Sequence, residues 1–239
     1  MIENQFNKIE NCLKAQRYLG RGIFIGKTPT TQKAVVAYFI SGRSQNSQNR
    51  IFVKSRDGLD IMLFDESKIE DTSLILYSPM RILKQHIIVT NGDQTETICD
   101  YISKGKTLEE ALNTRTFEPD KPNYTPRISG LIDFATDTFT YKLSILKNSD
   151  GLGRACTRQI FCYESCNGIG HFIHTYSGDG NPIPSFIGEP KQVASIDDID
   201  SFTNSIWKNL DSTYKIALAV YYIDLKSKEI EHRIINKKS

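Results

Sequence analysis

The feature that most constrains the fold is a long succession of short β-branched or aromatic runs separated by Gly, Asn and Ser. Runs of this kind are typical of β-strands joined by turns. They cover residues 22–26, 35–41, 50–54, 60–64, 73–77, 86–90, 127–134, 138–147, 156–163, 170–176 and 215–224. The last run is continuously apolar, which predicts a strand that is buried on both faces.

Helical patterns are few and widely separated. Residues 1–17 place an apolar residue at steps of four, three and four, the stripe of an amphipathic helix. Asp93 can cap a helix that runs to 104, Thr107 opens a capping box, and the acidic residues of 197–200 suit the start of a last helix. Many strands with few helices favour an α+β fold in which antiparallel sheet is covered by helices. We therefore expect an N-terminal helix over 1–17 and a single domain over 18–239.

Composition narrows the classes of partner. The 30 Lys and Arg against 28 Asp and Glu give a formal charge of +2, too small to argue for nucleic acid or a membrane surface. The longest apolar stretches, 34–40 and 216–223, are much shorter than the roughly 20 residues of a membrane span. The N-terminus carries no secretory pattern. We expect a cytoplasmic protein whose ligands are small.

The cysteines raise the question of a metal. Their odd number, five, in a chain of this size predicts reduced thiols rather than disulfides. Cys162 and Cys166 lie near His171 and His174, so a zinc site has to be considered. In a strand the two histidines would point to opposite faces. We therefore expect buried thiols, hydrogen-bonded histidines and no metal.

Arginines stand at two places suited to a small anion. Arg21 lies between two glycines, which let a ligand approach the backbone. Arg43 and Arg50 lie among hydroxyl and amide side chains in the link between two strands. The alternative interpretation is a tight turn and a polar hairpin loop with solvated arginines.

Other polar residues are candidates for binding or proton transfer. Asn91 and Gly92 join a strand to a helix, where backbone amides could hold an anion, although a plain turn with an N-cap explains them equally. Tyr77 ends an apolar run and Glu118 lies in a loop; either could move a proton or be structural. The sequence contains no recognisable catalytic triad, phosphate loop or dinucleotide fingerprint.

Four motifs, taken together, are more specific than any one of them. The segments 18–21, 41–44 with 49–50, 91–98 and 125–128 occur in the order and spacing of the IMP cyclohydrolase family known from archaea, which this chain resembles. The segment 170–182 resembles the bacterial branch of that family. The resemblance covers nearly everything after residue 17. It implies a fold similar to N-terminal nucleophile hydrolases, a four-layer αββα sandwich of two antiparallel sheets covered by helices.

The resemblance also implies an activity. The family closes the second purine ring: it converts 5-formamidoimidazole-4-carboxamide ribotide to IMP with loss of water, and it uses no metal or other cofactor. The implied partners are this purine ribotide and IMP, with a homo-oligomer left open. Two alternatives remain: a related cyclase or amidohydrolase acting on another purine-like ribotide, and a purine nucleotide-binding protein without catalysis.

The matching positions give a set of site residues. The resemblance places the nucleotide pocket around Arg43, Tyr77, Asn91 with Gly92, and Glu118, with Arg21, Arg50 and Arg127 as further contacts to anion or carboxamide. We expect Glu118 to take the amide proton and Tyr77 to donate to the formyl oxygen. We expect Arg43 to stabilise the developing oxyanion.

Overall fold

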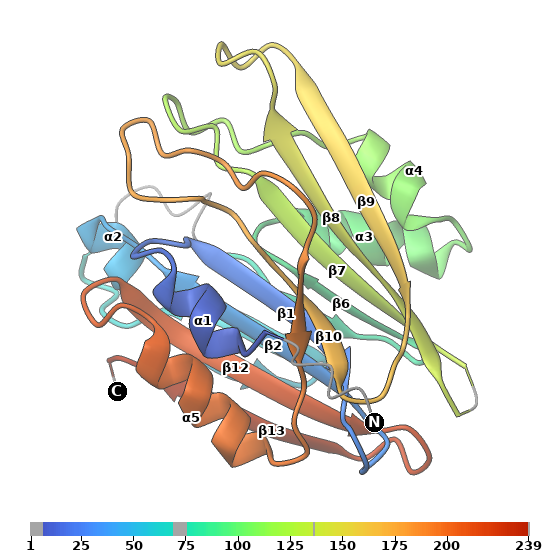
Figure 1. Ribbon diagram of the computed structural model, residues 1–239. Coiled ribbons are helices and arrows are strands. Elements are labelled where there is room, and N and C mark those ends of the chain that lie inside the picture. The colour runs from blue at the N-terminus through green and yellow to red at the C-terminus, as the bar shows by residue number, and fades with distance from the viewer. Residues whose placement is uncertain (1–6, 69–75, 136, 239) are drawn as a thin grey trace.

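The strands form two antiparallel sheets in the computed structural model, which describes residues 7–68, 76–135 and 137–238 (Figure 1). The six-stranded sheet has the order β11 (Lys191–Ala194), β10 (Ile169–His174), β1 (Arg21–Lys27), β2 (Lys33–Ser41), β12 (Lys215–Asp224), β13 (Ile230–Asn236). The seven-stranded sheet has the order β3 (Arg50–Ser55), β4 (Gly58–Leu63), β5 (Met80–Ile82), β6 (His86–Thr90), β7 (Arg127–Phe134), β8 (Phe139–Asn148), β9 (Cys156–Glu164).

Apolar residues on both faces put β2 and β12 at the centre of the six-stranded sheet. Tyr38 is paired with Ile23 of β1 on one side and with Ala219 of β12 on the other. Eight consecutive residues of β12 are buried. The prediction of a strand over 215–224 that is buried on both faces is therefore confirmed.

The main core lies between the two sheets. It is made of inward-facing residues such as Ile23 and Val36 of the six-stranded sheet and Val89 and Ile132 of the seven-stranded sheet, all at most 1% exposed. Since side chains alternate along a strand, the remaining residues of each strand face outward and need a second cover.

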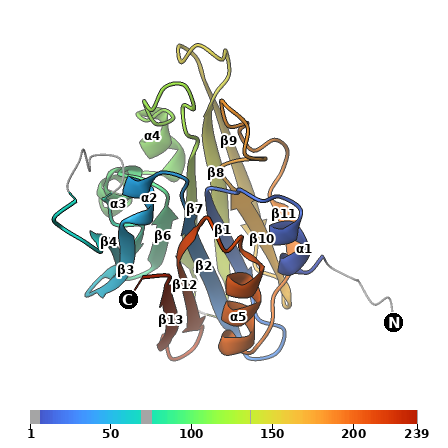
Figure 2. The same cartoon turned by 90° about the vertical axis from the view of Figure 1, so that its left-hand side faces the viewer.

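Helices cover the two outer faces. The helices α1 (Ile9–Lys14) and α5 (Ile199–Asn209) pack on the six-stranded sheet. The helices α3 (Gln94–Ser103) and α4 (Leu108–Asn113) pack on the seven-stranded sheet, on the opposite side of the molecule (Figure 2). The order of layers is thus helix, sheet, sheet, helix. An α+β fold of antiparallel sheet covered by helices is what the strand pattern predicted, and two such sheets are what the family resemblance implied.

The helix ends show which capping predictions hold. Thr107 forms the expected capping box with Glu110 at the start of α4. Asp93 stands at the N-cap position of α3, but its side chain makes no cap hydrogen bond; it pairs with Arg115 and Arg127 instead. A short additional helix, α2 (Gln45–Gln48), follows β2.

Several boundaries differ from the expectation. The N-terminal helix is shorter than 1–17: within the described residues it covers only α1, and residues 1–6 lie outside the description. The strand expected over 73–77 falls mostly on residues 69–75, which also lie outside it. Strands β5, β11 and β13 were not predicted. The first two have three and four residues, too few to give a pattern.

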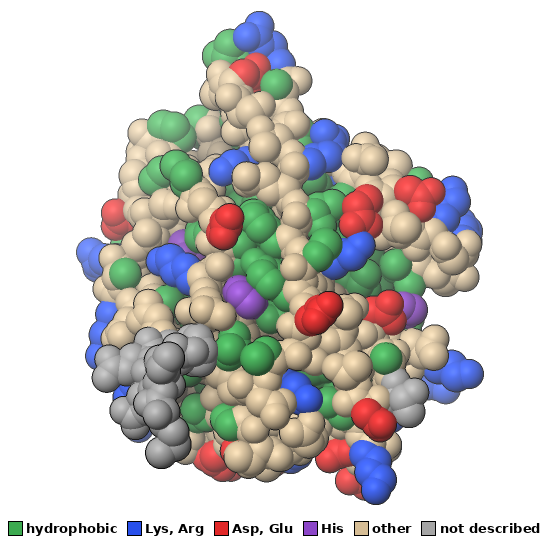
Figure 3. Space-filling view, turned by 45° about the vertical axis from the view of Figure 1, so that its right-hand side comes forward, with side chains coloured by type: hydrophobic (Ala, Val, Ile, Leu, Met, Phe, Trp, Pro, Cys, Tyr) green, Lys and Arg blue, Asp and Glu red, His purple; other side chains and the backbone are tan. Residues whose placement is uncertain are grey.

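The surface carries charges of both signs. Figure 3 shows basic and acidic side chains interspersed over one face, with hydrophobic side chains gathered along its middle. This mixture agrees with the small formal charge of +2. Among the described residues, no helix is long and apolar enough to cross a membrane.

Candidate active site

One end of the sandwich gathers most of the predicted site residues. Arg21 begins β1 in one sheet, and Arg50 and Arg127 begin β3 and β7 in the other. The antiparallel pairing brings these strand starts to the same end of the molecule, where β6 and β2 finish. Residues far apart in the sequence therefore meet at one place that both sheets build.

Arg21 and Glu118 form the buried centre of this cluster. Their side chains are 10% and 3% exposed, and Arg21 Nη2 lies 3.9 Å from Glu118 Oε2. The Glu118 backbone is held by a hydrogen bond of 2.9 Å from its N–H to the Thr125 carbonyl. Arg21 Nε and Glu118 Oε1 are buried without a hydrogen-bond partner among the described residues. Buried polar atoms normally have partners, so these two mark a position where a polar ligand would bind.

Burial sets the protonation of Glu118. It raises the pKa of this carboxyl to about 7, although the positive charges of Arg21 and Arg127 pull the pKa down. Burial is the largest single effect on Arg21 and lowers its pKa, but Glu118 and the tyrosines around it together raise the pKa above its usual value, so this guanidinium stays charged. A carboxyl that titrates near neutral pH can both accept and return a proton.

Arg50 adds a second buried cation. It is 1% exposed, its Nε donates to the Ser47 carbonyl at 2.9 Å, and its Nη1 has no partner among the described residues. Burial lowers its pKa, and the charge of Arg21 lowers it further. Arg21 and Arg50 thus share one carboxyl that is only partly ionised at neutral pH, which leaves an excess of buried positive charge suited to an anion.

Two tyrosine hydroxyls meet beside these cations. Tyr77 Oη and Tyr38 Oη are 2.7 Å apart. Both tyrosines interact electrostatically with Arg21 and with Arg50. The predicted proton donor Tyr77 therefore lies in the same cluster as Glu118. The sequence analysis missed Tyr38, because it stands inside the continuously apolar run of β2.

Arg127 reaches the cluster from the other side. Its Nη1 donates to Gln94 Oε1 at 2.7 Å, and it pairs with Asp93. A Cβ on Gly92 would lie 2.5 Å from Arg127 Nη1 and 3.5 Å from Glu118 Oε1. Gly92 therefore keeps open the space in which Arg127 approaches Glu118.

Asn91 is engaged by the protein itself. Its Nδ2 donates to the Pro126 carbonyl at 2.8 Å, and its Oδ1 accepts from the Ile128 N–H at 2.8 Å. The Gly92 N–H donates to Thr90 Oγ1 at 3.2 Å. These contacts fix the ends of β6 and β7 and favour a turn over an amide cradle for an anion.

Arg43 lies apart from the buried residues. Its side chain is exposed, it donates to the Asp179 carbonyl at 3.0 Å, and it stands over the Tyr18 ring at 5.3 Å. Tyr18 in turn interacts electrostatically with Arg21 and Arg50. Arg43 therefore lies at the outer edge of the cluster, joined to it through Tyr18, and contacts neither Glu118 nor Tyr77 by a hydrogen bond.

A second group that the sequence analysis missed supports the Glu118 loop. Asp120 accepts from the Thr125 N–H at 2.6 Å and also pairs with the Thr125 hydroxyl. The same hydroxyl contacts Tyr176 Oη, and the Tyr176 ring stacks on Tyr18 at 5.7 Å. The motif segments had included all but Asp120, yet no spacing in the sequence indicates that they meet.

The histidines and cysteines have other roles. His171 stacks on Tyr163 at 3.7 Å between ring centroids and bonds to Tyr141 Oη at 2.7 Å. His174 Nδ1 bonds to the Tyr176 carbonyl at 2.8 Å. All five cysteines are free, as expected, but the expectation of buried thiols holds only for Cys12. Cys162 and Cys166 are exposed, because Cys162 lies on the edge strand β9 and Cys166 follows that strand. In the part of the chain that the structure describes, no group of three or more His, Cys, Asp or Glu residues is placed to hold a metal ion.

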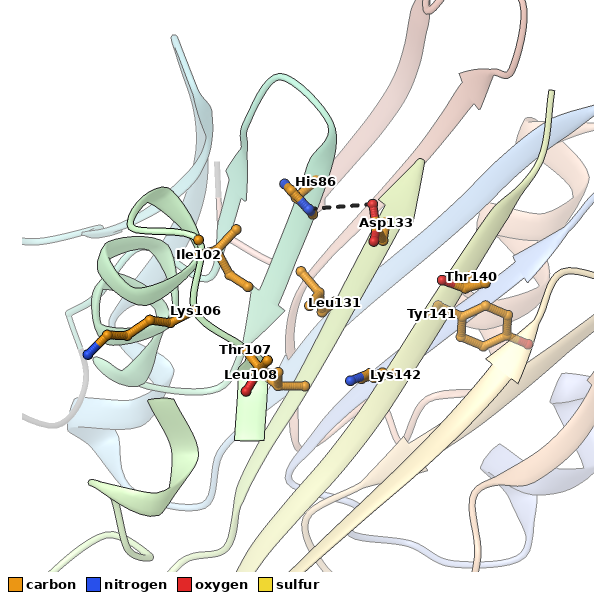
Figure 4. Close-up of a pocket in the computed structure, with 11 residues that line it drawn as sticks. His86, Ile102, Lys106, Thr107, Leu108, Leu131, Asp133, Thr140, Tyr141 and Lys142 are labelled. Carbon is orange, nitrogen blue, oxygen red and sulfur yellow. Dashed lines mark ion pairs between the residues drawn. The ribbon is translucent and has the colours of Figure 1, made fainter. Parts of the chain in front are cut away.

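Surface hollows away from the cluster offer less chemistry. One of about 280 Å³ lies where the α3–α4 link meets the outer face of β6, β7 and β8 (Figure 4). Most of its ionisable groups already have partners: His86 lies 3.4 Å from Asp133, Lys142 pairs with Glu109 at 2.6 Å, and Lys106 stands 5.0 Å from the centre of the Tyr101 ring. Another of about 510 Å³ lies between Ile82 of one sheet and Ile223 of the other. Neither contains a predicted site residue.

Known proteins resemble this chain over most of its length. Residues 18–228 match the family described as IMP cyclohydrolase-like protein. The IMP cyclohydrolase of Methanopyrus kandleri is 29% identical over 175 residues, 70% of this chain and 79% of the relative. That of Methanocella arvoryzae is 33% identical over 120 residues, 48% and 57% of the two chains. That of Methanococcus maripaludis strain C7 is 27% identical over 168 residues, 67% and 82%. The helix α1 precedes the matched region.

Proposed function

Because the chain belongs to the IMP cyclohydrolase-like family, we propose that it closes the second purine ring, converting 5-formamidoimidazole-4-carboxamide ribotide to IMP with loss of water. The observation that carries the proposal is the buried cluster of Arg21, Arg50, Glu118 and Tyr77, in which charged atoms lack partners. It combines a carboxyl that titrates near neutral pH with a phenol and two cations.

The ring closure needs only positioning of the substrate and proton transfer. Nucleophile and electrophile are parts of one molecule, so the protein has to hold the reactive conformation and move protons. In the first step the carboxamide nitrogen adds to the formyl carbon. Glu118 takes a proton from that nitrogen, and Tyr77 gives its proton to the formyl oxygen. A tetrahedral carbinolamine forms, with Glu118 protonated and Tyr77 ionised.

The second step restores both residues. The C–O bond breaks as Glu118 returns its proton to the hydroxyl group, which leaves as water. The former formamido nitrogen gives its proton to Tyr77 as the C=N bond forms. Two protons thus pass from nitrogen to oxygen and nothing is oxidised or reduced, so the two reaction steps need no redox or group-transfer partner.

The arginines divide into an inner and an outer set. Arg21 and Arg50 lie beside Tyr77 and Glu118, which favours them for stabilising negative charge on the formyl oxygen and on Tyr77. The sequence-based role of Arg43 was the oxyanion. Its exposed position beside Tyr18 favours instead an outer contact to the ribotide, such as its phosphate. Arg127 is the inner contact for the carboxamide in this proposal.

The fold and the substrate fit one interpretation. We propose that residues 18–239 form one domain of the kind seen in N-terminal nucleophile hydrolases, supported by the helix, sheet, sheet, helix order of layers. The purine ribotide would then bind where both sheets end. This placement makes the activity depend on residues of both sheets.

A direct assay tests the proposal. Purified protein is incubated with the formamido ribotide and a chelator, and IMP is followed by chromatography. A rate well above the uncatalysed one that is lost in Glu118→Gln and kept in Glu109→Gln supports it, because Glu109 is a carboxylate that pairs with Lys142 outside the cluster. Tight IMP binding without turnover would indicate a nucleotide-binding protein. Turnover of another ribotide alone would indicate a different cyclase.

A further inference from the structure

Tyr38 is a buried polar residue in a place built for aliphatic side chains. It stands in the middle of β2 between the inward-facing Val36 and Ile40 and is 0% exposed. Its ring stacks on Phe52 of the other sheet, with centroids 5.6 Å apart. In the described part of the chain, Tyr77 Oη is the one hydrogen-bond partner of its hydroxyl. Packing alone would be served by phenylalanine.

The surroundings decide which hydroxyl donates. Arg21 and Arg50 are the charged groups near the tyrosine pair from β1 and β3, and a guanidinium only donates hydrogen bonds. If Tyr77 donated to Tyr38, the Tyr38 proton would have no acceptor among these groups. If Tyr38 donates, the Tyr77 proton is free to point away from Tyr38, toward a substrate or solvent, because Tyr77 is only half-buried. The second arrangement therefore leaves neither tyrosine proton buried without an acceptor.

We propose that Tyr38 is a positioning residue for the cyclisation: its hydroxyl donates to Tyr77 Oη, directs the Tyr77 proton to the substrate oxygen and stabilises the Tyr77 phenolate. This inference rests on the proposed function. Burial and the neighbouring Tyr77 raise the pKa of Tyr38 well above its usual value, so Tyr38 remains protonated as a donor throughout. The charges of Arg21 and Arg50 act on the same phenolate from β1 and β3, and Glu118 pairs with Arg21.

The test compares two buried tyrosines. Tyr38→Phe removes the bridging hydroxyl, and Tyr221→Phe is the matched control: Tyr221 is 1% exposed, faces the same core and donates to the Gly58 carbonyl at 3.3 Å. We expect Tyr38→Phe to lower kcat about 10- to 100-fold with KM nearly unchanged, the factor for one hydrogen bond to a charged group. A fall in kcat with an unchanged KM is the split expected of a residue that acts on the transition state and not on substrate binding.

A double mutant separates positioning from structure. Adding Tyr38→Phe to Tyr77→Phe should cost almost no further activity, because Tyr38 acts through Tyr77. A multiplicative loss, or a Tyr38→Phe enzyme as active as the Tyr221→Phe control, overturns the inference. Should Tyr38→Phe fail to fold, 3-fluorotyrosine at position 38 keeps the shape and makes the hydroxyl a stronger hydrogen-bond donor, so kcat should change while KM does not. An unchanged kcat counts against the inference. An inactive wild-type protein overturns the proposed function as well.

Discussion

Between pH 6 and pH 8 the turnover number should rise about tenfold, because Glu118 must be ionised before it can accept a proton from the substrate. With its pKa raised by burial to about 7, about 9% of this carboxyl is ionised at pH 6 and about 91% at pH 8. A glutamate with the ordinary pKa of about 4.3 would be almost fully ionised at both pH values, and the profile would be flat.

The assay is IMP formation at saturating ribotide, which reports groups in the bound complex rather than titration of free substrate. Glu118→Gln should lower kcat by about 10²- to 10⁴-fold and abolish the rise, whereas Glu109→Gln should keep it. A flat wild-type profile over this range would refute the reasoning about burial. A rise of equal size in Glu118→Gln would assign the titration to another group.

Further predictions concern charge, space and stability. The folded-state pKa of Glu118 lies above its unfolded value, so the stability that this group contributes is present below about pH 4.5 and lost as pH rises through 7. In urea unfolding, the free energy of unfolding of wild type should therefore fall by about 2–3 kcal/mol relative to that of Glu118→Gln between pH 5 and pH 8. Arg50→Met should weaken ribotide binding by about 1.5–3 kcal/mol while raising the Tm of the free protein, because it removes a buried cation next to another. Arg43→Ala, at an exposed position, should weaken ribotide binding by at most about 1 kcal/mol, measured by calorimetry. If Arg43→Ala weakened binding as much as Arg50→Met or more, Arg43 would belong to the inner set and Arg50 to the outer one. Gly92→Ala should displace the Arg127 guanidinium and weaken binding of the ribotide; unchanged affinity would remove Arg127 from the site.

Strong hydrophobic runs made much of the sheet predictable. The strand Arg127–Phe134 and the strand Lys215–Asp224 have the predicted limits, because β-branched and aromatic residues recur in them and polar residues bound them. The strand Ile230–Asn236 was missed: its seven residues form an edge strand, and charged and polar residues interrupt its apolar ones. Its place depends on pairing with its neighbour, which local sequence does not encode.

The sequence predicted some residues of the buried cluster but not their arrangement. The family pattern assigned Arg21, Tyr77 and Glu118 to one pocket, and in the structure Tyr77 and Glu118 both interact with Arg21. The sequence could not reveal that Glu118 is 3% exposed, and its altered pKa follows from that burial. Nor could it separate the exposed Arg43 from the buried Arg50, since both stand in the same polar link. These differences arise from tertiary packing.

The cluster spans both sheets, with Arg21 and Tyr38 in one and Arg50 and Arg127 in the other. Binding of a ligand to the cluster is therefore linked to the integrity of the whole sandwich. A ligand held by both sheets binds the folded state and has no equivalent in a chain whose sheets have separated. By mass action, free ligand at a hundred times its Kd would add about 2.7 kcal/mol to the free energy of unfolding. Melting temperature then becomes a readout of ligand binding for every variant that folds, active or not. Separation of the sheets at this end, rather than fraying of their outer edges, would be the opening that ligand suppresses in hydrogen exchange.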